Sequence, residues 1–283
     1  MKKFIVFIFS SVFLLSCSLE YRAIKSFEEN IPNTNIMLLM PDDLLKTNAK
    51  SELNYDEIKH SDYDSLIEIS DFLHKFDDST FKIKFKTALE SEFENINVKV
   101  YFENQWKDFH ANYNDSNKDL MNFIIMDFKQ IEIEEKFIEE LFEEYHGDLY
   151  YKETLIINAL SLNSWVNISV LDSNFRNENL VFFTSTIKDD VDAAFKPELF
   201  SLEADFLYKI DSIADKELNS IHNLAAKELV YNSFNFLVNN YMDILLLREK
   251  GRLPDYYSKF NSNISRVYPV YEKPDYYVIK KGN

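Results

Sequence analysis

Alternation of apolar and polar residues between Leu160 and Val170 constrains the fold more than any other feature of the sequence. Successive side chains of a β-strand point to opposite faces, so this pattern predicts a strand with one apolar and one polar face. A second alternating stretch, Val181 to Ile187, follows the turn-rich residues 172–179. Together the two stretches predict an antiparallel hairpin in a sheet that has one side exposed to water.

The polar face of the first of these strands also carries an aromatic side chain. Trp165 lies in phase with Asn163 and Asn167. An indole in such a position is either covered by another element or available to a partner. We expect the long C-terminal helix to cover it, and Trp165 is otherwise a candidate residue of an interaction surface.

Three further stretches of the sequence predict strands. A continuous apolar run over residues 36–40 is stopped by Pro41, which is typical of a buried central strand. Alternation over residues 98–102 predicts another strand. Residues 123–133 alternate with a change of phase near Lys129, and such a change predicts a β-bulge.

Apolar residues at three- and four-residue spacing predict helices over residues 66–76, 81–93 and 218–245. Asp77-Asp78-Ser79 offers N-cap chemistry for the second of these helices, and Gly251 is a suitable C-cap for the last. Residues 42–64, which are polar and show little periodicity, predict a long loop. The sequence therefore predicts an α+β fold: a mixed, mainly antiparallel sheet packed by helices, with a helical C-terminal third.

The N-terminus has the organisation of a bacterial signal peptide. Lys2 and Lys3 supply positive charge, and residues 4–15 are apolar except for two serines, which is too short to span a bilayer as an anchor. The stretch ends in Leu14-Leu15-Ser16-Cys17, which resembles the lipobox of bacterial lipoproteins. The resemblance implies cleavage before Cys17, lipidation of its sulfur and acylation of the new amino group. Cys17 is also the only cysteine, so no intrachain disulfide can compete for it.

These features divide the chain into four parts. We expect a signal peptide at 1–16, a lipidated tether at 17–35, a single α+β domain at 36–250 and a Tyr/Pro-rich tail at 251–283. Loss of the signal peptide removes two lysines and takes the formal net charge from -17 to -19. So acidic a domain is repelled by anionic lipid and stands off the surface on its tether.

The residue after the lipidated cysteine bears on the location of the protein. Ser18 stands there in place of an aspartate, which resembles the pattern of sorting to the outer membrane. No run of acidic residues follows that would resemble a surface-export signal. We therefore expect a protein that is attached to the outer membrane through the lipid at Cys17 and faces the periplasm.

Composition and motifs exclude several kinds of chemistry. The 3 glycines are never close together, so a P-loop, a dinucleotide fingerprint or a nucleophile elbow cannot form. The acid excess argues against a nucleic-acid partner. Three acid-x-x-His pairs recur, but a di-iron bundle needs four long helices, which this strand-rich chain lacks; the pairs are Glu57 with His60, Asp71 with His74 and Glu143 with His146. We expect no metal, no cofactor and no enzymatic activity.

Residues 132–144 contain seven glutamates among apolar residues that are spaced as on a helix. Glu139, Glu140, Glu143 and Glu144 are candidates for a surface that binds a cation or a basic partner. The alternative is an exposed, solvated face of a helix or of a hairpin loop, which we favour. No EF-hand pattern accompanies the glutamates, which argues against a calcium site.

Between residues 36 and 190 the order of predicted elements resembles the α/β domains of envelope-assembly lipoproteins, such as the curli-secretion type and the activators of penicillin-binding proteins. The resemblance is one of pattern and carries no site residues with it. It implies a non-enzymatic, lipid-anchored adaptor or assembly factor with an envelope protein as partner. Two alternatives stay open: a lipoprotein that binds a small ligand or hydrolyses an envelope substrate, and an oligomeric pore or secretion component whose 154–188 hairpin inserts into a membrane.

Overall fold

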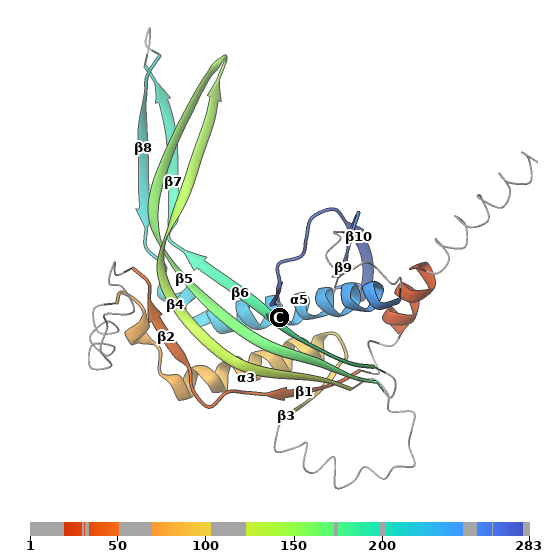
Figure 1. The fold of residues 1–283 in the computed structure, drawn as a ribbon. Coiled ribbons are helices and arrows are strands. Elements are labelled where there is room, and N and C mark those ends of the chain that lie inside the picture. Colours follow the sequence, from red (N-terminus) through yellow and green to blue (C-terminus); the bar gives the residue numbers. More distant parts are fainter. Residues whose placement is uncertain are drawn as a thin grey trace, which may run out of the picture.

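The structure is a computed structural model, and it describes residues 20–29, 31, 34–50, 70–102, 123–172, 175–198, 202–245, 254–261 and 263–279. A mixed sheet with two long helices on one side forms the base of the molecule, and a narrow arm of β-strands extends from it (Figure 1). Several sequence predictions lie outside the described residues: the signal peptide and lipobox, the helix start at 66–69, the Gly251 cap and the Glu57/His60 pair. The α+β class is confirmed.

Seven of the described strands form the main sheet, in the order β11-β6-β5-β4-β1-β3, with β2 paired to β4. The pairs of β1 with β3 and β4, and of β2 with β4, are parallel, and the others are antiparallel. The strands are β1 (Asn35–Leu39), β2 (Leu45–Asn48), β3 (Lys99–Phe102), β4 (Phe123–His146), β5 (Leu149–Asp172), β6 (Phe175–Lys188) and β11 (Tyr277–Ile279). β1 is buried at its centre, as the apolar run before Pro41 predicts. β2 lies inside the segment 42–64 that was predicted to be a loop, so this prediction is wrong at residues 45–48.

The predicted bulge in β4 is confirmed by a register shift between Phe128 and Gln130. Met126 and Phe128 are buried before the shift, and Ile131 and Ile133 are buried after it. The extra residue keeps both apolar pairs on the same side of the sheet, because it moves the side-chain phase by one position.

Both long helices pack on that same side, which we call the helix side. α3 (Asp78–Asn95) places Phe85 against Phe128 of β4, with ring centroids 6.3 Å apart. α5 (Asp215–Leu245) packs on β6 and contacts α3, where Phe93 and Phe234 lie 6.4 Å apart. The predicted cap is confirmed, since the Asp77 carboxylate accepts a hydrogen bond from the Thr80 amide at 2.8 Å. Of the predicted helix at 66–76, the described part contains only a short 3-10 turn, η4 (Leu73–Lys75).

The helical C-terminal third is overstated by the sequence prediction. α5 is flanked by strands, which are β7 (Asp190–Pro197) and β8 (Ala204–Asp211) before it and β9 (Tyr257–Asn261), β10 (Arg266–Val270) and β11 after it. The tail is held to α5 by asparagines whose side-chain oxygens accept strand amides: Asn235 from Phe260 at 2.7 Å and Asn239 from Ser258 at 2.8 Å. None of the helices in the described part of the chain is long and apolar enough to cross a membrane.

Part of the expected tether is helical. Residues 20–29 form a helix near the C-terminal half of α5 (Figure 1). Ala23 is buried there with Val238 and Met242, and Glu28 accepts a hydrogen bond from the Val267 amide at 2.7 Å. The stretch between Cys17 and the folded body is therefore shorter than the sequence indicates.

Candidate interaction surface on the arm

The arm begins where β4 and β5 extend beyond their neighbours in the main sheet. Pairing with β2 ends at Glu135, and pairing of β5 with β6 ends at Ala159. Beyond these residues, the strand pairing of the described chain joins β4 to β5 alone, up to the turn at Gly147. Gly147 has a φ of 63°, a left-handed conformation that glycine adopts without strain. We define the arm as residues 136–158 together with 190–198 and 202–211.

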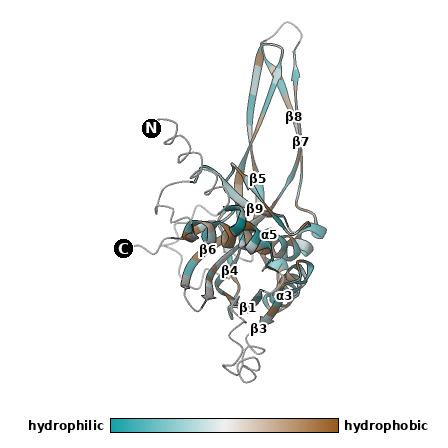
Figure 2. Ribbon diagram, turned by 90° about the vertical axis from the view of Figure 1, so that its right-hand side faces the viewer, coloured by the Kyte–Doolittle hydropathy of each residue, from teal (hydrophilic) through white to brown (hydrophobic). Residues whose placement is uncertain are grey.

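The second part of the arm is the β7–β8 hairpin, which packs on one face of the β4–β5 hairpin (Figure 2). Four aromatic rings, those of Phe142, Tyr151, Phe195 and Phe206, fill the space between the hairpins. Phe195 and Phe206 have centroids 4.9 Å apart, Phe142 and Phe206 5.7 Å, and Tyr151 and Phe195 5.7 Å. We call the β4–β5 face that contacts these rings the inner face, and the opposite one the outer face.

We expect Phe206→Ala to release the β7–β8 hairpin from the arm without unfolding the base. Phe206 contacts rings from both hairpins, and an isolated two-stranded hairpin is marginal in water. Truncation of a packed Phe costs about 3 kcal/mol, so amide hydrogen exchange across 190–211 should become at least about tenfold faster, while α5 stays protected. Leu207→Ala is the matched control, because Leu207 is exposed on the far side of the same strand. Equal exchange rates in both variants would show that the rings do not hold the hairpin.

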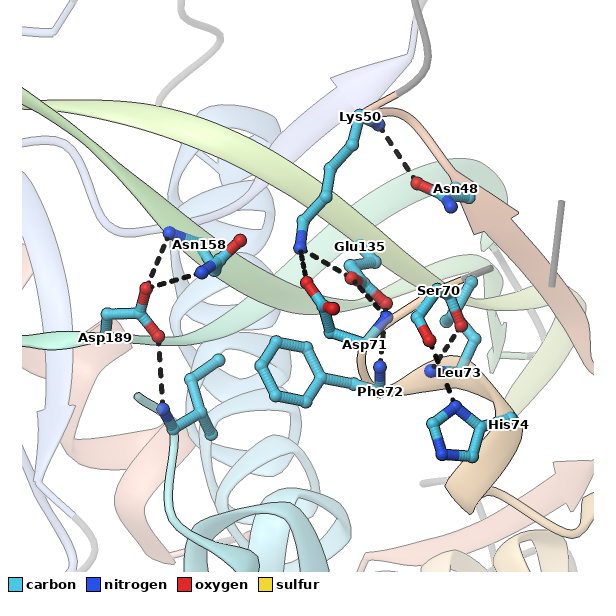
Figure 3. Close-up of polar contacts among 11 residues, drawn as sticks. Asn48, Lys50, Ser70, Asp71, Phe72, Leu73, His74, Glu135, Asn158 and Asp189 are labelled. Atoms are coloured by element: carbon cyan, nitrogen blue, oxygen red, sulfur yellow. Dashed lines mark hydrogen bonds and ion pairs between the residues drawn. The ribbon is translucent and has the colours of Figure 1, made fainter. Parts of the chain in front are cut away.

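A buried carboxylate, Glu135, anchors the base of the arm (Figure 3). Its side chain has no exposed surface and lies 2.6 Å from the ammonium of Lys50. It also accepts hydrogen bonds from the Asp71 and Phe72 amides, at 3.0 and 3.1 Å. Burial lowers the pKa of Lys50, but hydrogen bonds and charge interactions with Asp71 and Glu135 outweigh it and leave this pKa above its ordinary 10.5. The ion pair thus fixes the segment before η4 to β4 at the point where the arm leaves the sheet.

A second buried carboxylate, Asp189, fixes the β7–β8 hairpin to the same place (Figure 3). Its Oδ2 accepts from the backbone and side-chain nitrogens of Asn158 at 2.9 and 2.7 Å. Its Oδ1 accepts from the Ile213 amide at 3.1 Å. Asp189 therefore joins the chain entering β7, the chain leaving β8 and strand β5.

The outer face continues the helix side of the main sheet beyond the reach of the helices. Residues of β4 that follow Ile133 and Glu135 in phase lie on it, opposite even-numbered residues of β5. It consists of Phe137, Glu139, Leu141, Glu143, Tyr145, Tyr150, Lys152, Thr154 and Ile156. Its five large apolar or aromatic side chains are between 45% and 72% exposed. An apolar sheet face that would be core in the base is thus open to solvent on the arm.

Several side chains of the outer face contact one another or a residue at the base of the arm. The Tyr150 hydroxyl donates a hydrogen bond to Glu143, and its ring lies 4.8 Å from that of Tyr145. The hydrogen bond to Glu143, with smaller contributions from burial and nearby charge, raises the pKa of Tyr150 to about 12. Lys50 lies 5.1 Å from the ring of Phe137 at the base of the arm. Tyr150 therefore keeps its proton at neutral pH, and its hydroxyl donates a hydrogen bond to the Glu143 carboxylate.

The predicted glutamate surface is divided between the two faces. The segment is a strand and not a helix, so alternate glutamates point in opposite directions. Glu139 and Glu143 lie on the outer face. Glu140 and Glu144 lie on the inner face, where Glu140 contacts the Lys188 ammonium at 2.6 Å and Glu144 accepts from the Phe195 amide at 3.3 Å. The helix-like spacing was misleading because residues four apart share a face in strands as well as in helices.

Trp165 lies away from the arm and is not covered by a helix, which corrects the sequence expectation. It lies on the side of the sheet opposite the helices and is half-buried against Phe182, at 4.9 Å between ring centroids. Phe182 in turn contacts Tyr277 of the edge strand β11 at 6.3 Å. The helices use the other side because the buried leucines of β5 lie there. Trp165 and the glutamates therefore do not form one surface.

The acid-x-x-His pairs do not form metal sites in the described part of the chain. Asp71 binds Lys50, whereas the ring of His74 contacts the Ser70 carbonyl at 3.1 Å. Glu143 and His146 are on opposite faces of a strand. The described residues contain no group of three or more His, Cys, Asp or Glu side chains that could hold a metal ion.

A small pocket lies between η4, α3 and α5. Its volume is about 130 Å³, and Lys75, Lys84, Asp215 and His222 are among its lining residues. Burial, with a smaller effect of the Lys84 charge, lowers the pKa of His222. Ligand pockets for drug-sized molecules occupy roughly 300–1,000 Å³. The pocket lies below that range.

Comparisons with known proteins do not identify a family for this chain. No family model matches the chain, and no match is found among curated proteins. One similar solved structure is a neuraminyllactose-binding hemagglutinin homolog from Helicobacter pylori, with 10% identity and a TM-score of 0.25. The match covers 75% of this chain and 87% of that chain. At this TM-score the similarity supports no argument about fold or function, and the chain is assigned to no family.

Proposed function

We propose that this protein is a lipid-anchored, non-enzymatic adaptor of the cell envelope, attached to the outer membrane through Cys17, and that it binds a protein partner with its arm. The observation that carries the proposal is the exposed apolar outer face of the arm. Five large apolar or aromatic side chains are exposed together on the β4–β5 hairpin, which favours contact with another macromolecule. Two buried carboxylates fix both hairpins of the arm to the base, which favours a rigid binding element.

The path of the chain supports an arrangement in which the lipid anchor and the arm lie at opposite ends of the molecule. Cys17 precedes Glu20, and the helix that begins there packs on the C-terminal half of α5 (Figure 1). α5 starts just after the arm and has 31 residues, a length of about 46 Å at 1.5 Å per residue. An anchor at one end of α5 and an arm at the other favour a projection directed away from the membrane.

The alternatives have less support. In the hairpin considered for membrane insertion, residues 159–172 pair with residues 175–188 within the main sheet. The arm's own β4 strand carries Glu139 and Glu143 on one face and Glu140 and Glu144 on the other, so neither face suits lipid. The pocket at η4, in the described part of the chain, is smaller than pockets that hold drug-sized ligands, which disfavours a small-ligand or hydrolytic role there.

Photo-crosslinking in the cells that make the protein tests the adaptor role. With a photo-reactive amino acid at Leu141, on the outer face, we expect a discrete adduct of the full-length lipoprotein with a partner protein. The same probe at Ile83, which is comparably exposed but lies on α3, should give no adduct. Equal adducts at the two sites, or none at Leu141, would contradict binding through the arm.

A further inference from the structure

We infer that the partner bound by the outer face of the arm presents a basic amphipathic helix. The inference rests on the proposed function and specifies the chemistry of the partner. It is carried by three properties of the outer face: its continuity with the helix-covered side of the sheet, its pattern of apolar and acidic side chains, and the charge of the arm as a whole.

Continuity with the base indicates the kind of element that fits. In the base, α3 and α5 cover the helix side of β4, β5 and β6. The outer face is the same side of β4 and β5, and no helix of the described part of the chain covers it. From Phe137 to Tyr145 it runs for about 26 Å at 3.3 Å per residue, which a helix of about 17 residues would cover. A helix from a partner would thus extend the existing helix layer over the arm.

The pattern of side chains indicates the character of that helix. Along β4, Phe137, Leu141 and Tyr145 alternate with Glu139 and Glu143. On β5, Ile156 lies opposite Glu139, and Lys152 lies opposite Glu143. An apolar stripe flanked by lysine or arginine matches these rows, because buried apolar contacts supply affinity and opposite charges supply specificity.

The negative charge of the arm argues against two other binding partners for the outer face, a second copy of the arm and an anionic lipid surface. The 42 described residues of the arm contain 12 Asp and Glu against 4 Lys, a net charge of -8, which is nearly half of the -17 of the whole chain. A second copy of the arm would bring two such charges together, and an anionic lipid surface would repel the arm. A basic polypeptide is attracted to it at long range.

Binding of a synthetic peptide to the purified mature protein tests the inference. The probe is a fluorescent 18-residue peptide of leucine and lysine in amphipathic helical order, followed by anisotropy at low salt. We expect saturable binding that is at least about tenfold weaker for two comparison peptides: the same residues in an order that leaves no apolar face, and a leucine–glutamate peptide with the original pattern.

Matched variants locate the binding. The E139K/E143K pair and the Leu141→Ser/Ile156→Ser pair should each weaken binding at least about tenfold. The D192K/D205K pair makes the same change of charge on the exposed far side of the β7–β8 hairpin and should change binding less than about threefold. Circular dichroism of each variant verifies that the fold is retained.

Four outcomes would overturn the inference. They are no binding of the amphipathic peptide, equal binding of the reordered peptide, equal weakening by D192K/D205K, and association with phosphatidylglycerol vesicles or self-association through this face. The outcome for the proposed function is separate. If the Leu141 crosslink forms in cells and is undiminished by E139K/E143K, the arm binds a partner whose contact surface is not basic.

Discussion

Replacing Glu135 with alanine should destabilise the protein by about 3–5 kcal/mol, the usual cost of removing one partner from a buried ion pair. The substitution leaves the Asp71 and Phe72 amides without their acceptor. It leaves the Lys50 ammonium, whose side chain is 11% exposed, with Asp71 as its ion-pair partner. Urea unfolding followed by circular dichroism measures the loss as a lower midpoint at unchanged slope.

Two control variants separate the charge from the position in the strand. Glu139→Ala removes an exposed carboxylate from the same strand and should cost less than about 0.5 kcal/mol. Glu135→Ala combined with Lys50→Met removes both charges and should recover part of the loss, since no buried ammonium remains. If Glu135→Ala is no more destabilising than Glu139→Ala, the ion pair does not hold the base of the arm.

The same pair predicts a dependence of stability on pH. The pKa of Lys50 in the folded protein is raised above 10.5. Protonated Lys50 therefore contributes stability that is fully present below pH 10.5 and is lost as the pH rises through the folded pKa. The Glu135→Ala variant should lose less stability over that alkaline range than the wild type, which repeated unfolding at each pH measures.

Replacing Cys17 with serine should move nearly all of the protein from the membrane fraction to the soluble fraction. The proposed anchor consists of several acyl chains, and each buried methylene contributes about 0.8 kcal/mol, whereas one chain alone holds a protein only marginally. The acidic mature domain has no compensating attraction to anionic lipid. Fractionation of cells grown with labelled palmitate measures both the location and the modification.

A substitution inside the same signal region serves as the comparison. Ser10→Ala leaves the lipobox residues intact and should retain the label and the membrane location. If the Cys17→Ser protein remains in membranes after a high-salt wash, the lipid is not the anchor. If it is labelled as strongly as the wild type, another residue carries the acyl chains.

Local patterns were sufficient for several features of the fold. The alternation in β5 and β6 predicted their pairing, because a strand with one buried face has a side-chain period of two. The phase slip near Lys129 predicted the bulge, since one extra residue is the simplest way to keep Phe128 and Ile131 on the same side. Asp77 predicted the start of α3 through the orphan amides of its first turn.

The glutamate-rich stretch shows where local patterns fail. Phe137, Leu141 and Tyr145 are four residues apart, a spacing that satisfies a helix face and a strand face alike. Pairing with β5 decides in favour of the strand, and that pairing joins residues that no local window contains. Pairing also decides that Glu139 is exposed on the outer face, whereas Glu135, four residues earlier and in the same phase, is fully buried.

The sequence by itself determined the strands of the hairpin, the bulge and the two long helices, because each depends on residues within a few positions of one another. The tertiary structure alone decided that β4 and β5 extend beyond their neighbours in the sheet. It also decided that the β7–β8 hairpin covers the inner face of the β4–β5 hairpin and that the outer face is exposed. These are properties of how far separate strands extend and which elements reach a given side. They depend on contacts between segments that are distant in the sequence, and local periodicity does not predict such contacts.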